Sequence, residues 1–294
     1  MKVAAVLVNF NGGDFLAGCV ASLRSEAVDR IAVADNGSTD GSIERLLMDE
    51  PTLAGSVVAT GANLGYGGGA NRAAASLRPP PDALLVCNPD VVVHPGTVKA
   101  LIAALEDDPG LGIVGPLIEN ADGSIYPSAR SFPSLVDAAG HGFLGLIAPK
   151  NRFSRRYRRL DADNTRPGRV DWVSGACFLI RWSTWEAIGG FDDKTFFMYM
   201  EDVDLCWRAS QRGWMVGFEP AARVMHVQGT ATSKRPYRMI LAHHRSMYRF
   251  ADRTTTGPER LLLPVMAVGM AVRSGLASLA HWWAGRTRQQ TSAL

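Results

Sequence analysis

Four short apolar runs, each closed by a polar turn and followed by a helical pattern, dominate the first part of the chain. The runs cover residues 3–8, 31–34, 56–60 and 83–87. Runs that are apolar at every position are typical of strands buried on both faces of a sheet. Strands that alternate with helices predict right-handed crossover connections. We therefore expect an α/β fold whose mostly parallel sheet is covered by helices on both faces.

Polar residues follow these runs where the predicted strands end. They are Asn9, Asp35, Asn63 and Asp90. Asn and Asp are common in turns, and this alone explains any one of the four. In open α/β sheets, however, ligands bind beyond the carboxyl ends of the strands, where loops and helix N-termini converge. Four polar loops on one edge predict a binding site there.

Two glycine-containing stretches exclude the common nucleotide-binding motifs. Residues 9–13 lack G-x-G-x-x-G, and residues 61–69 lack the Lys-Ser/Thr pair of a P-loop. We interpret residues 61–69 as a flexible loop before a helix that starts at Ala70. This loop leads to Arg72, whose guanidinium suits a phosphate or the edge of a base.

The second half of the chain has a less regular pattern. Residues 119–133 are loop-like, and residues 135–147 are apolar and loosely helical. A strand with a kink at Gly175 is expected next, followed by a short helix. His226 lies in an apolar run, where a lone histidine is most often a core residue. Strands are expected at residues 171–181, 215–218 and 223–227.

Three carboxylates stand in an apolar setting between residues 196 and 208. Glu201, Asp202 and Asp204 follow an aromatic and Met-rich run. Burial raises the pKa of a carboxyl group toward the range of a general base. On a helix Asp204 pairs with Arg208 one turn later, which leaves Asp202 for chemistry with Glu201 in support. The alternative is that all three form the solvated first turn of an amphipathic helix.

Charge and cysteine content limit the possible partners. The 294-residue chain has a formal net charge of only +3, so no global field attracts nucleic acid. A local basic run with aromatic residues at 150–159 favours anionic lipid head groups or a diphosphate; a solvated loop and nucleic acid are the alternatives. The four scattered cysteines suit reduced thiols in a cytosolic protein. The N-terminus is expected to form a strand, not a signal peptide.

The last 36 residues, 259–294, contain two apolar stretches separated by Arg273. Neither reaches the roughly 20 residues needed to span a bilayer. Tryptophans at 282 and 283 with nearby arginines favour a helix that lies in the head-group plane. A core helix or an oligomer contact is the alternative.

Taken together, the loops and the acidic stretch resemble the inverting family-2 glycosyltransferases of GT-A fold, over about residues 1–250. Within that family the chain is most similar to rhamnosyltransferases and related galactofuranosyltransferases. The resemblance implies a nucleotide-sugar half at 1–118, an acceptor half at 119–250 and an amphipathic helical tail at 251–294. The matching motifs are residues 8–12, 35–40, 63–66 with 71–72, 88–90, 189–192, 197–208 and His226.

The resemblance also implies roles for single residues on the donor side. Asp35 would bind the base of the nucleotide. Asp90 and His226 would hold Mn²⁺ or Mg²⁺, and Asn88 stands where the family has the first acid of its DxD motif. With one carboxylate, metal binding should depend on the diphosphate oxygens of the donor. Near Asp35, the nucleotide sugar would also contact Asn9, Asn63 and Arg72.

On the acceptor side, the resemblance implies that Asp202 is the catalytic base. One base and one cation suffice for a single displacement with inversion. A retaining mechanism would need a nucleophilic carboxylate as well as an acid/base group, and no such pair stands out in the sequence. Acceptor contacts are expected from Trp172, Gly175 and Asp192.

The implied activity is transfer of L-rhamnose from dTDP-L-rhamnose to a polyprenyl-diphosphate-linked N-acetylglucosamine in cell-wall linker synthesis. Such an enzyme would act peripherally at the cytoplasmic face of the cell membrane. Galactofuranosyl or other hexosyl transfer is the main alternative. A sugar-nucleotide-binding scaffold is the non-enzymatic one, and a nucleotidyltransferase is disfavoured because no basic Gly-rich loop follows the first strand. The oligomeric state stays open.

Overall fold

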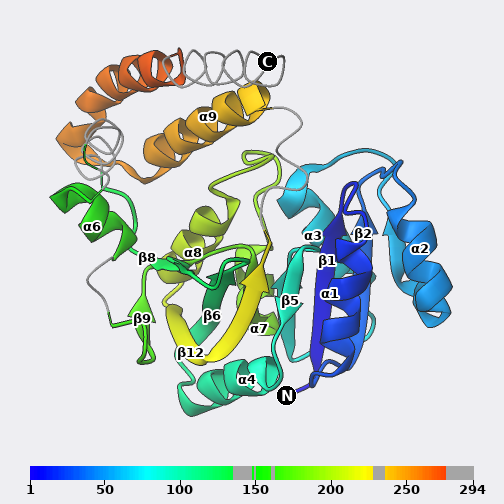
Figure 1. The fold of residues 1–294 in the computed structure, drawn as a ribbon. Helices are drawn as coiled ribbons and strands as arrows, with labels where there is room; N and C mark the ends of the chain where they lie inside the picture. The colour runs from blue at the N-terminus through cyan, green and yellow to red at the C-terminus, as the bar shows by residue number, and fades with distance from the viewer. Residues whose placement is uncertain (135–147, 149, 160–162, 228–235, 276–294) are drawn as a thin grey trace, which may run out of the picture.

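The computed structural model describes residues 1–134, 148, 150–159, 163–227 and 236–275. The loose helix expected at 135–147 and the tail beyond residue 275 lie outside this part of the chain. Figure 1 shows a central sheet with helices in front of it and behind it. Helix α9, Pro236–Thr254, crosses above the sheet.

The first half of the sheet is parallel, as the apolar runs predict. Strand β1 (Val3–Asn9) lies between β2 (Arg30–Asp35) and β4 (Ala83–Cys87), and β3 (Val57–Ala59) forms the edge beside β2. Every residue of β1 is buried. Burial on both faces explains why this run is apolar at every position.

The complete sheet is mixed, in contrast to the expected mostly parallel one. Strand β11 (Cys177–Arg181) runs antiparallel to both β4 and β6 (Leu111–Asn120). The chain leaves β6 at the carboxyl edge of the sheet, and β11 runs back from that same edge. A chain that re-enters a sheet at the edge it left must run in the opposite direction.

The last long strand, β12 (Met215–His226), replaces the two short strands expected at 215–218 and 223–227, with an irregular register between Glu219 and Arg223. It pairs in parallel with β6 and antiparallel with β5 (Val91–Val93), a strand absent from the sequence-based prediction. The smaller elements are β7 (Ile125–Tyr126), β8 (Ala129–Arg130), α6 (Arg152–Arg158), β9 (Gly168–Val170) and β10 (Trp172–Val173).

Two apolar clusters lie on opposite faces of the sheet. Val3, Ala5 and Leu7 of β1 belong to one cluster, and Ala4 and Val6 belong to the other. This alternation follows from the period of two in a strand. On the first face lie α1 (Phe15–Arg24), α2 (Ser42–Asp49), the 3₁₀ turn Pro51–Ser56 and α4 (Thr97–Asp107). On the second lie α3 (Gly65–Ser76), α7 (Trp182–Ile188) and α8 (Glu201–Gln211).

Helix α3 begins at Gly65, so the flexible loop expected at 61–69 is wrong for its last five residues. A Cβ atom at Gly67 would lie 2.8 Å from Cβ of Phe191, and one at Gly69 would lie 2.5 Å from a methyl group of Val8. These glycines let the helix approach the sheet closely. The low helix propensity of glycine is thus overruled by packing.

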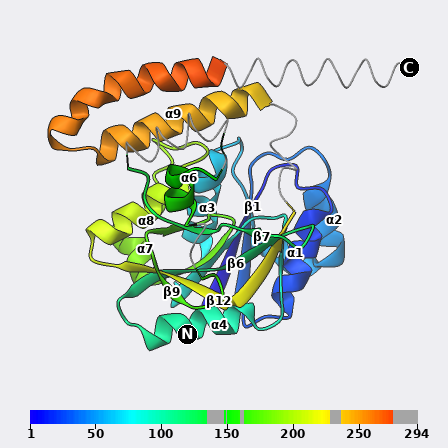
Figure 2. The same cartoon turned by 60° about the vertical axis from the view of Figure 1, so that its left-hand side comes forward.

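The C-terminal part of the described chain forms a layer above the sheet. After α9 come the 3₁₀ turn Gly257–Leu262 and a helix over residues 263–275. Both views show this helix beside α9 (Figures 1 and 2), and Arg273 contacts His244 of α9 at 3.0 Å. Among the described residues, none of the helices combines the length and the hydropathy that a membrane span requires.

The expected domain boundaries fall inside elements of this fold. Residue 118 lies in β6, and residue 250 lies in α9. Both apolar clusters contain residues from before and after position 118. The described residues up to Thr254 are therefore organised around one large sheet, beside which β8 and β10 form a two-stranded sheet.

Candidate active site

An open cavity of about 370 Å³ lies at the carboxyl edge of β1 and β4, where the polar loops were predicted to converge. It receives side chains from both halves of the chain. Of the predicted site residues, the cavity is lined by Asn63, Asn88, Asp90, Gly175, Glu201, Asp202 and His226. The other lining residues include Phe10, Asn36, Tyr66, Tyr126, Ser174, Met198 and Tyr199.

The first turn of α8 brings Asp202 and Glu201 to this cavity. Tyr199 and Met200 precede the helix with φ of 66° and 68°, a left-handed conformation that is strained for residues with side chains. Strain of this kind persists where the surrounding structure enforces it. The two residues turn the chain so that α8 starts at the wall of the cavity.

Asp202 is held by two backbone N–H groups. Gly175 donates to Oδ2 at 2.8 Å, and Val203 donates to Oδ1 at 2.9 Å. A Cβ atom at position 175 would lie 3.1 Å from Cβ of Asp202. The single kinked strand expected at 171–181 is wrong, because the chain breaks here into β10 and β11, which belong to different sheets. The absence of a side chain at Gly175 lets the backbone approach the carboxylate closely.

The two acids differ in their hydrogen bonds. Burial raises the pKa of Asp202, while the N–H groups of Gly175 and Val203 and the charge of Arg130 oppose this rise. Burial, followed by the charge of Asp202, raises the pKa of Glu201 to about 8. Oε2 of Glu201 is buried without a hydrogen-bond partner among the described residues. Near neutral pH Glu201 therefore keeps its proton, while the two N–H groups favour the charged form of Asp202.

Asp90 and His226 form the second chemical group in the cavity. Strand β5 pairs with the end of β12 so that Val91 lies opposite His226. Nε2 of His226 consequently lies 3.0 Å from Oδ1 of Asp90, and 3.4 Å from the side-chain amide of Asn88. Both Asp90 and His226 are nearly enclosed, with side chains 9% and 13% exposed.

These side chains fit a divalent ion that is shared with a ligand. A carboxylate and an imidazole are suitable donors for Mn²⁺, and a carboxylate also suits Mg²⁺. The described residues contain no group of three or more His, Cys, Asp or Glu side chains arranged to hold a metal. The described residues thus supply a partial coordination shell, which the oxygens of a diphosphate would complete.

The donor-side residues separate into two groups. Asn63 lines the cavity and accepts a hydrogen bond from Gly65 N–H at 2.9 Å. Asn9 is fully buried, and its amide donates to Ser38 and Ser42. It holds two loops together and does not line the cavity.

Asp35 and Arg72 lie outside the cavity lining. Asp35 ends β2 and accepts from Ser38 N–H at 3.1 Å, and its neighbour Asn36 lines the cavity instead. Arg72 is exposed on α3. The preceding residue, Asn71, exchanges two hydrogen bonds of 2.9 Å with the backbone of Phe191. Successive side chains of a helix point in different directions. Because the side chain of Asn71 is held at Phe191, that of Arg72 points elsewhere and is exposed to solvent.

Two of the three expected acceptor residues also lie away from the cavity lining. Trp172 is buried and donates from Nε1 to the carbonyl of Ser131 at 2.9 Å. Asp192 pairs with Arg253 of α9 at 2.5 Å. Gly175 is the expected acceptor residue that lines the cavity.

Arg130 was not predicted from the sequence, yet it lies close enough to Asp202 for its charge to act on that carboxylate. Its guanidinium carbon is 5.0 Å from the ring centre of Trp172. Its Nη2 group donates a hydrogen bond of 2.8 Å to the hydroxyl of Tyr126. Its charge also acts on Asp202, whose pKa it lowers. An arginine between an alanine and a serine in a loop-like segment carries no pattern that would have marked it.

Asp204 has the structural role predicted for it. Its carboxylate is fully buried and accepts from Nε of Arg208 at 2.6 Å, which confirms the predicted pair. It also accepts from Nη1 of Arg253. The same Arg208 donates to the carbonyls of Ile188 and Gly190, so this cluster connects α7, α8 and α9.

Comparison with known proteins assigns the family. Residues 3–247 match the family model described as "Glycosyltransferase like family 2". The chain belongs to glycosyltransferase family 2. The match covers every residue that lines the cavity, which is therefore the candidate active site of a glycosyltransferase.

Characterised relatives of this glycosyltransferase include rhamnosyltransferases. It is 40% identical over 286 residues to the N-acetylglucosaminyl-diphospho-decaprenol L-rhamnosyltransferase of Mycobacterium tuberculosis, with 92% of this chain and 91% of the relative covered. It is 30% identical over 146 residues to the rhamnosyltransferase WbbL of Escherichia coli K12, with 49% of this chain and 52% of the relative covered.

Solved structures show that this glycosyltransferase has a GT-A-like fold. The mannosyltransferase PcManGT from Pyrobaculum calidifontis, in complex with GDP-Man and Mn²⁺, superposes with a TM-score of 0.60 at 15% identity, covering 99% of this chain and 79% of that one. GalNAc-T7 with UDP, GalNAc and Mn²⁺ gives a TM-score of 0.58 at 16% identity, covering 77% and 43%.

Proposed function

We propose that this glycosyltransferase transfers L-rhamnose from dTDP-L-rhamnose to the N-acetylglucosamine of a polyprenyl-diphosphate lipid, with inversion, in the synthesis of a cell-wall linker. The observation that carries the proposal is the 40% identity, over nine-tenths of both chains, to an enzyme named for that acceptor and that sugar. The arrangement of the cavity supports it, because the proposed base, Asp202, and the two proposed metal ligands, Asp90 and His226, line the same cavity.

In the proposed reaction Asp202 acts as the general base. It removes the proton from the acceptor hydroxyl as that oxygen attacks the anomeric carbon of the donor. The N–H groups of Gly175 and Val203 fix the orientation of its carboxylate. Because Glu201 keeps its own proton near neutral pH, it stays uncharged beside the carboxylate that must accept one.

Asp90 and His226 would hold Mn²⁺ or Mg²⁺ together with the diphosphate of the donor. The bound ion supplies positive charge that stabilises the departing nucleoside diphosphate. Asn88 contributes an amide beside the pair. On the same side, Asn36 and Asn63 line the cavity near the end of β2, where the base of the nucleotide would bind.

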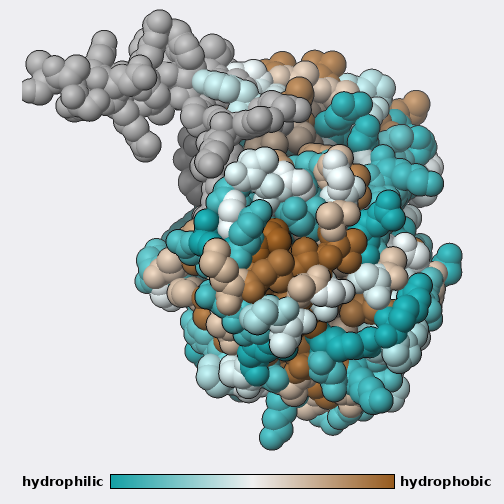
Figure 3. Space-filling model, turned by 90° about the vertical axis from the view of Figure 1, so that its right-hand side faces the viewer, coloured by the Kyte–Doolittle hydropathy of each residue, from teal (hydrophilic) through white to brown (hydrophobic). Residues whose placement is uncertain are grey.

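A peripheral position at the cytoplasmic face of the membrane is part of the proposal. Leu261, Val265, Val268 and Val272 are each more than half exposed and recur at helical spacing. Figure 3 shows hydrophobic residues interspersed with polar ones at the top of the molecule, where the C-terminal helices lie. A row of this kind suits a helix that inserts its apolar side into the head-group region. Exposed arginines of α6 add positive charge to the same end of the molecule (Figure 1).

The test is incubation of the full-length protein in detergent with labelled nucleotide sugars and N-acetylglucosaminyl-diphospho-polyprenol, with Mn²⁺ or Mg²⁺ present. We expect a rhamnosylated lipid from dTDP-L-rhamnose, with the anomeric configuration of the sugar inverted. A product formed only from UDP-galactofuranose would replace this proposal with galactofuranosyl transfer. Donor binding without turnover of any donor in the panel would favour a binding protein.

A further inference from the structure

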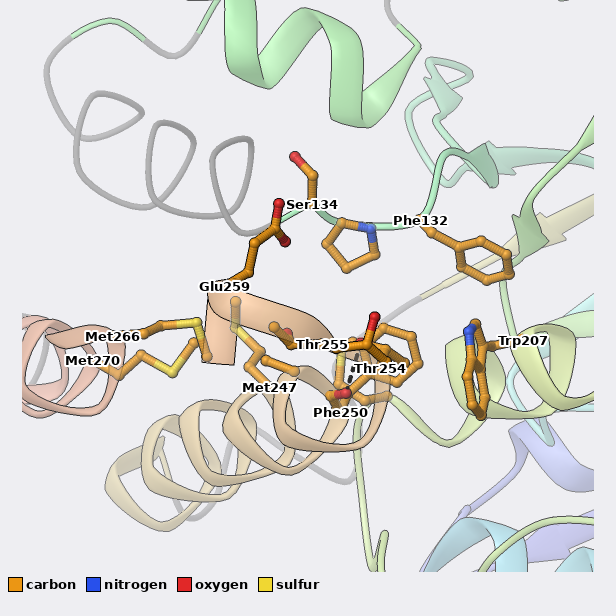
Figure 4. A pocket seen from close by; sticks show the side chains of 14 residues that line it. Phe132, Ser134, Trp207, Met247, Phe250, Thr254, Thr255, Glu259, Met266 and Met270 are labelled. Atoms are coloured by element: carbon orange, nitrogen blue, oxygen red, sulfur yellow. Dashed lines mark hydrogen bonds between the residues drawn. The ribbon is translucent and has the colours of Figure 1, made fainter. Parts of the chain in front are cut away.

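A second cavity, of about 240 Å³, lies between α8, α9 and the helix over residues 263–275. Figure 4 shows Met266 and Met270 extending from the C-terminal helix toward Met247 of α9, with Trp207 of α8 on the opposite side. The proposed reaction does not use this cavity. Its other lining residues include Met200, Phe250 and Glu259.

The second cavity and the active site share a wall. Met200 lines the second cavity, while its neighbours Tyr199 and Glu201 line the active site. The left-handed conformation of Tyr199 and Met200 makes this arrangement possible, because it turns consecutive side chains toward different spaces. A ligand whose polar head binds at Asp202 therefore has an apolar cavity on the other side of this wall.

The chemistry of the lining selects an uncharged, flexible hydrocarbon. Four methionines contribute to it: Met200, Met247, Met266 and Met270. Methionine is unbranched and polarisable, so it adapts to ligands of irregular shape. Among the described lining residues, Glu259 is the only one with a charged side chain. A negative charge disfavours a phosphate in this cavity, so the diphosphate of a lipid would lie outside it.

The C-terminal helix connects this cavity to the apolar surface. Met266 and Met270 are one turn apart and line the cavity, whereas Val265, Val268 and Val272 are 70%, 65% and 52% exposed on the outside. The same helix thus forms a wall of the cavity and carries the row proposed to contact the bilayer. A lipid chain that leaves the bilayer at this helix would pass from the exposed valines on its outer side to the methionines on its inner side.

We propose that the cavity binds the isoprenoid chain of the acceptor, at the units next to the diphosphate, while the acceptor sugar lies at Asp202. The inference rests on the proposed function, since it assigns a second site to the same lipid. Binding of the chain would hold the sugar hydroxyl near the base at low acceptor concentration. Chain length should consequently affect KM for the acceptor more than kcat.

The decisive experiment compares two acceptors that share the N-acetylglucosaminyl-diphosphate head. One has a long polyprenyl chain and the other a short, water-soluble alkyl tail. Met247→Trp and Met270→Trp place a larger side chain in the cavity. Assayed in detergent, each should lower kcat/KM for the long-chain acceptor at least about tenfold, mainly through KM, and change the short-tailed acceptor by less than about twofold.

The matched control is Met48→Trp, the same substitution at a methionine of α2 that is 75% exposed. It should leave both acceptors unchanged. Normal turnover of the short-tailed acceptor shows that a variant is folded. Equal losses on both acceptors, or no loss on either, would overturn the assignment of the cavity.

A binding measurement separates this inference from the proposed reaction, because it needs no turnover. An N-acetylglucosaminyl-diphosphate lipid with a diazirine on its first isoprene unit should label peptides from residues 247–256 and 263–275, and unlabelled long-chain acceptor should prevent the labelling. Labelling of these peptides without rhamnose transfer would contradict the proposed reaction but still support the lipid site. Labelling of other peptides, or cross-linking between two copies of the chain through this face, would contradict the assignment of the cavity as a lipid site.

Discussion

Arg253 of α9 and Asp204 of α8 form an ion pair in which the carboxylate is fully buried, although the two residues are 49 positions apart. Asp204 is two residues beyond the proposed base. The same guanidinium also contacts Asp192. Ion pairs therefore join helix α9 to α8, the helix that carries the proposed base, and a mutation that breaks these pairs should affect both helices.

Arg253→Met should destabilise the fold by about 2 to 3 kcal/mol, because it leaves Asp204 with Arg208 as its remaining cation. Chemical denaturation measures the change. Arg260→Met is the matched control, because its pair with Asp252 is about half exposed and should contribute less than about 1 kcal/mol. Equal effects from both substitutions would contradict the role given to Arg253.

Asp202→Asn should lower kcat by about 100- to 10,000-fold, the usual contribution of a general base. The amide keeps the size of the side chain, so donor binding measured by calorimetry should stay within about twofold. Asp49→Asn, at an exposed position of α2, is the control. An Asp202→Asn enzyme with near-normal turnover would show that another group takes the proton.

The raised pKa of Glu201 predicts a pH-dependent stability. In the unfolded chain this group titrates near 4.5, and in the folded chain near 8. Between these values the unfolded state loses a proton that the folded state keeps, so the free energy of unfolding falls as pH rises. Glu201→Gln removes this contribution, and its Tm relative to wild type should increase from pH 5 to pH 8.

The control for that series is Glu44→Gln, at an exposed position of α2. Its Tm difference from wild type should be constant over the same pH range. A constant difference for Glu201→Gln as well would mean that Glu201 titrates normally.

Asp90→Asn and His226→Ala should each lower turnover by at least about 100-fold, because a divalent ion contributes several kcal/mol to the stabilisation of a leaving diphosphate. EDTA should inactivate the wild-type enzyme, and Mn²⁺ or Mg²⁺ should restore it. Full activity in the chelator would exclude the metal-binding role of this pair.

The double substitution Val265→Asp and Val268→Asp should weaken binding to anionic vesicles at least about tenfold, because each buried valine contributes about 1.5 kcal/mol or more. Co-sedimentation measures the bound fraction. Met48→Asp on α2 replaces an apolar residue that is as exposed and should have no effect. Unchanged sedimentation of the double variant would argue against this helix as the membrane contact.

The strands and the acidic stretch were predictable because their signals are local. Continuous apolar runs identified β1, β2, β3 and β4, and four-residue spacing identified the pair of Asp204 and Arg208. The start of α3 was not predictable, because Gly67 is helical only where it meets Phe191, 124 residues away. Local propensity contains no information about such a contact.

In the candidate site, too, local sequence patterns identified some residues correctly, while the orientation of others depends on distant contacts. Asp90, Asp202 and His226 were identified individually, and the structure places all three in one cavity. Asn9 has the same strand-end pattern as Asp90, yet its amide is taken up by Ser38 and Ser42. Whether a polar side chain at a strand end faces a ligand or another loop depends on residues that are distant in sequence.

Strand β5 pairs with the end of β12, and this pairing has a consequence for how the enzyme can be assembled or divided. Asp90 and His226 are separated by 136 positions and meet only when the last strand has joined the sheet. A ribosome must synthesise nearly the whole region that matches the family before both side chains proposed to bind the ion are present. A gene cut at residue 118 would therefore produce a first half that keeps Asp90 but cannot serve as a free-standing sugar-nucleotide module.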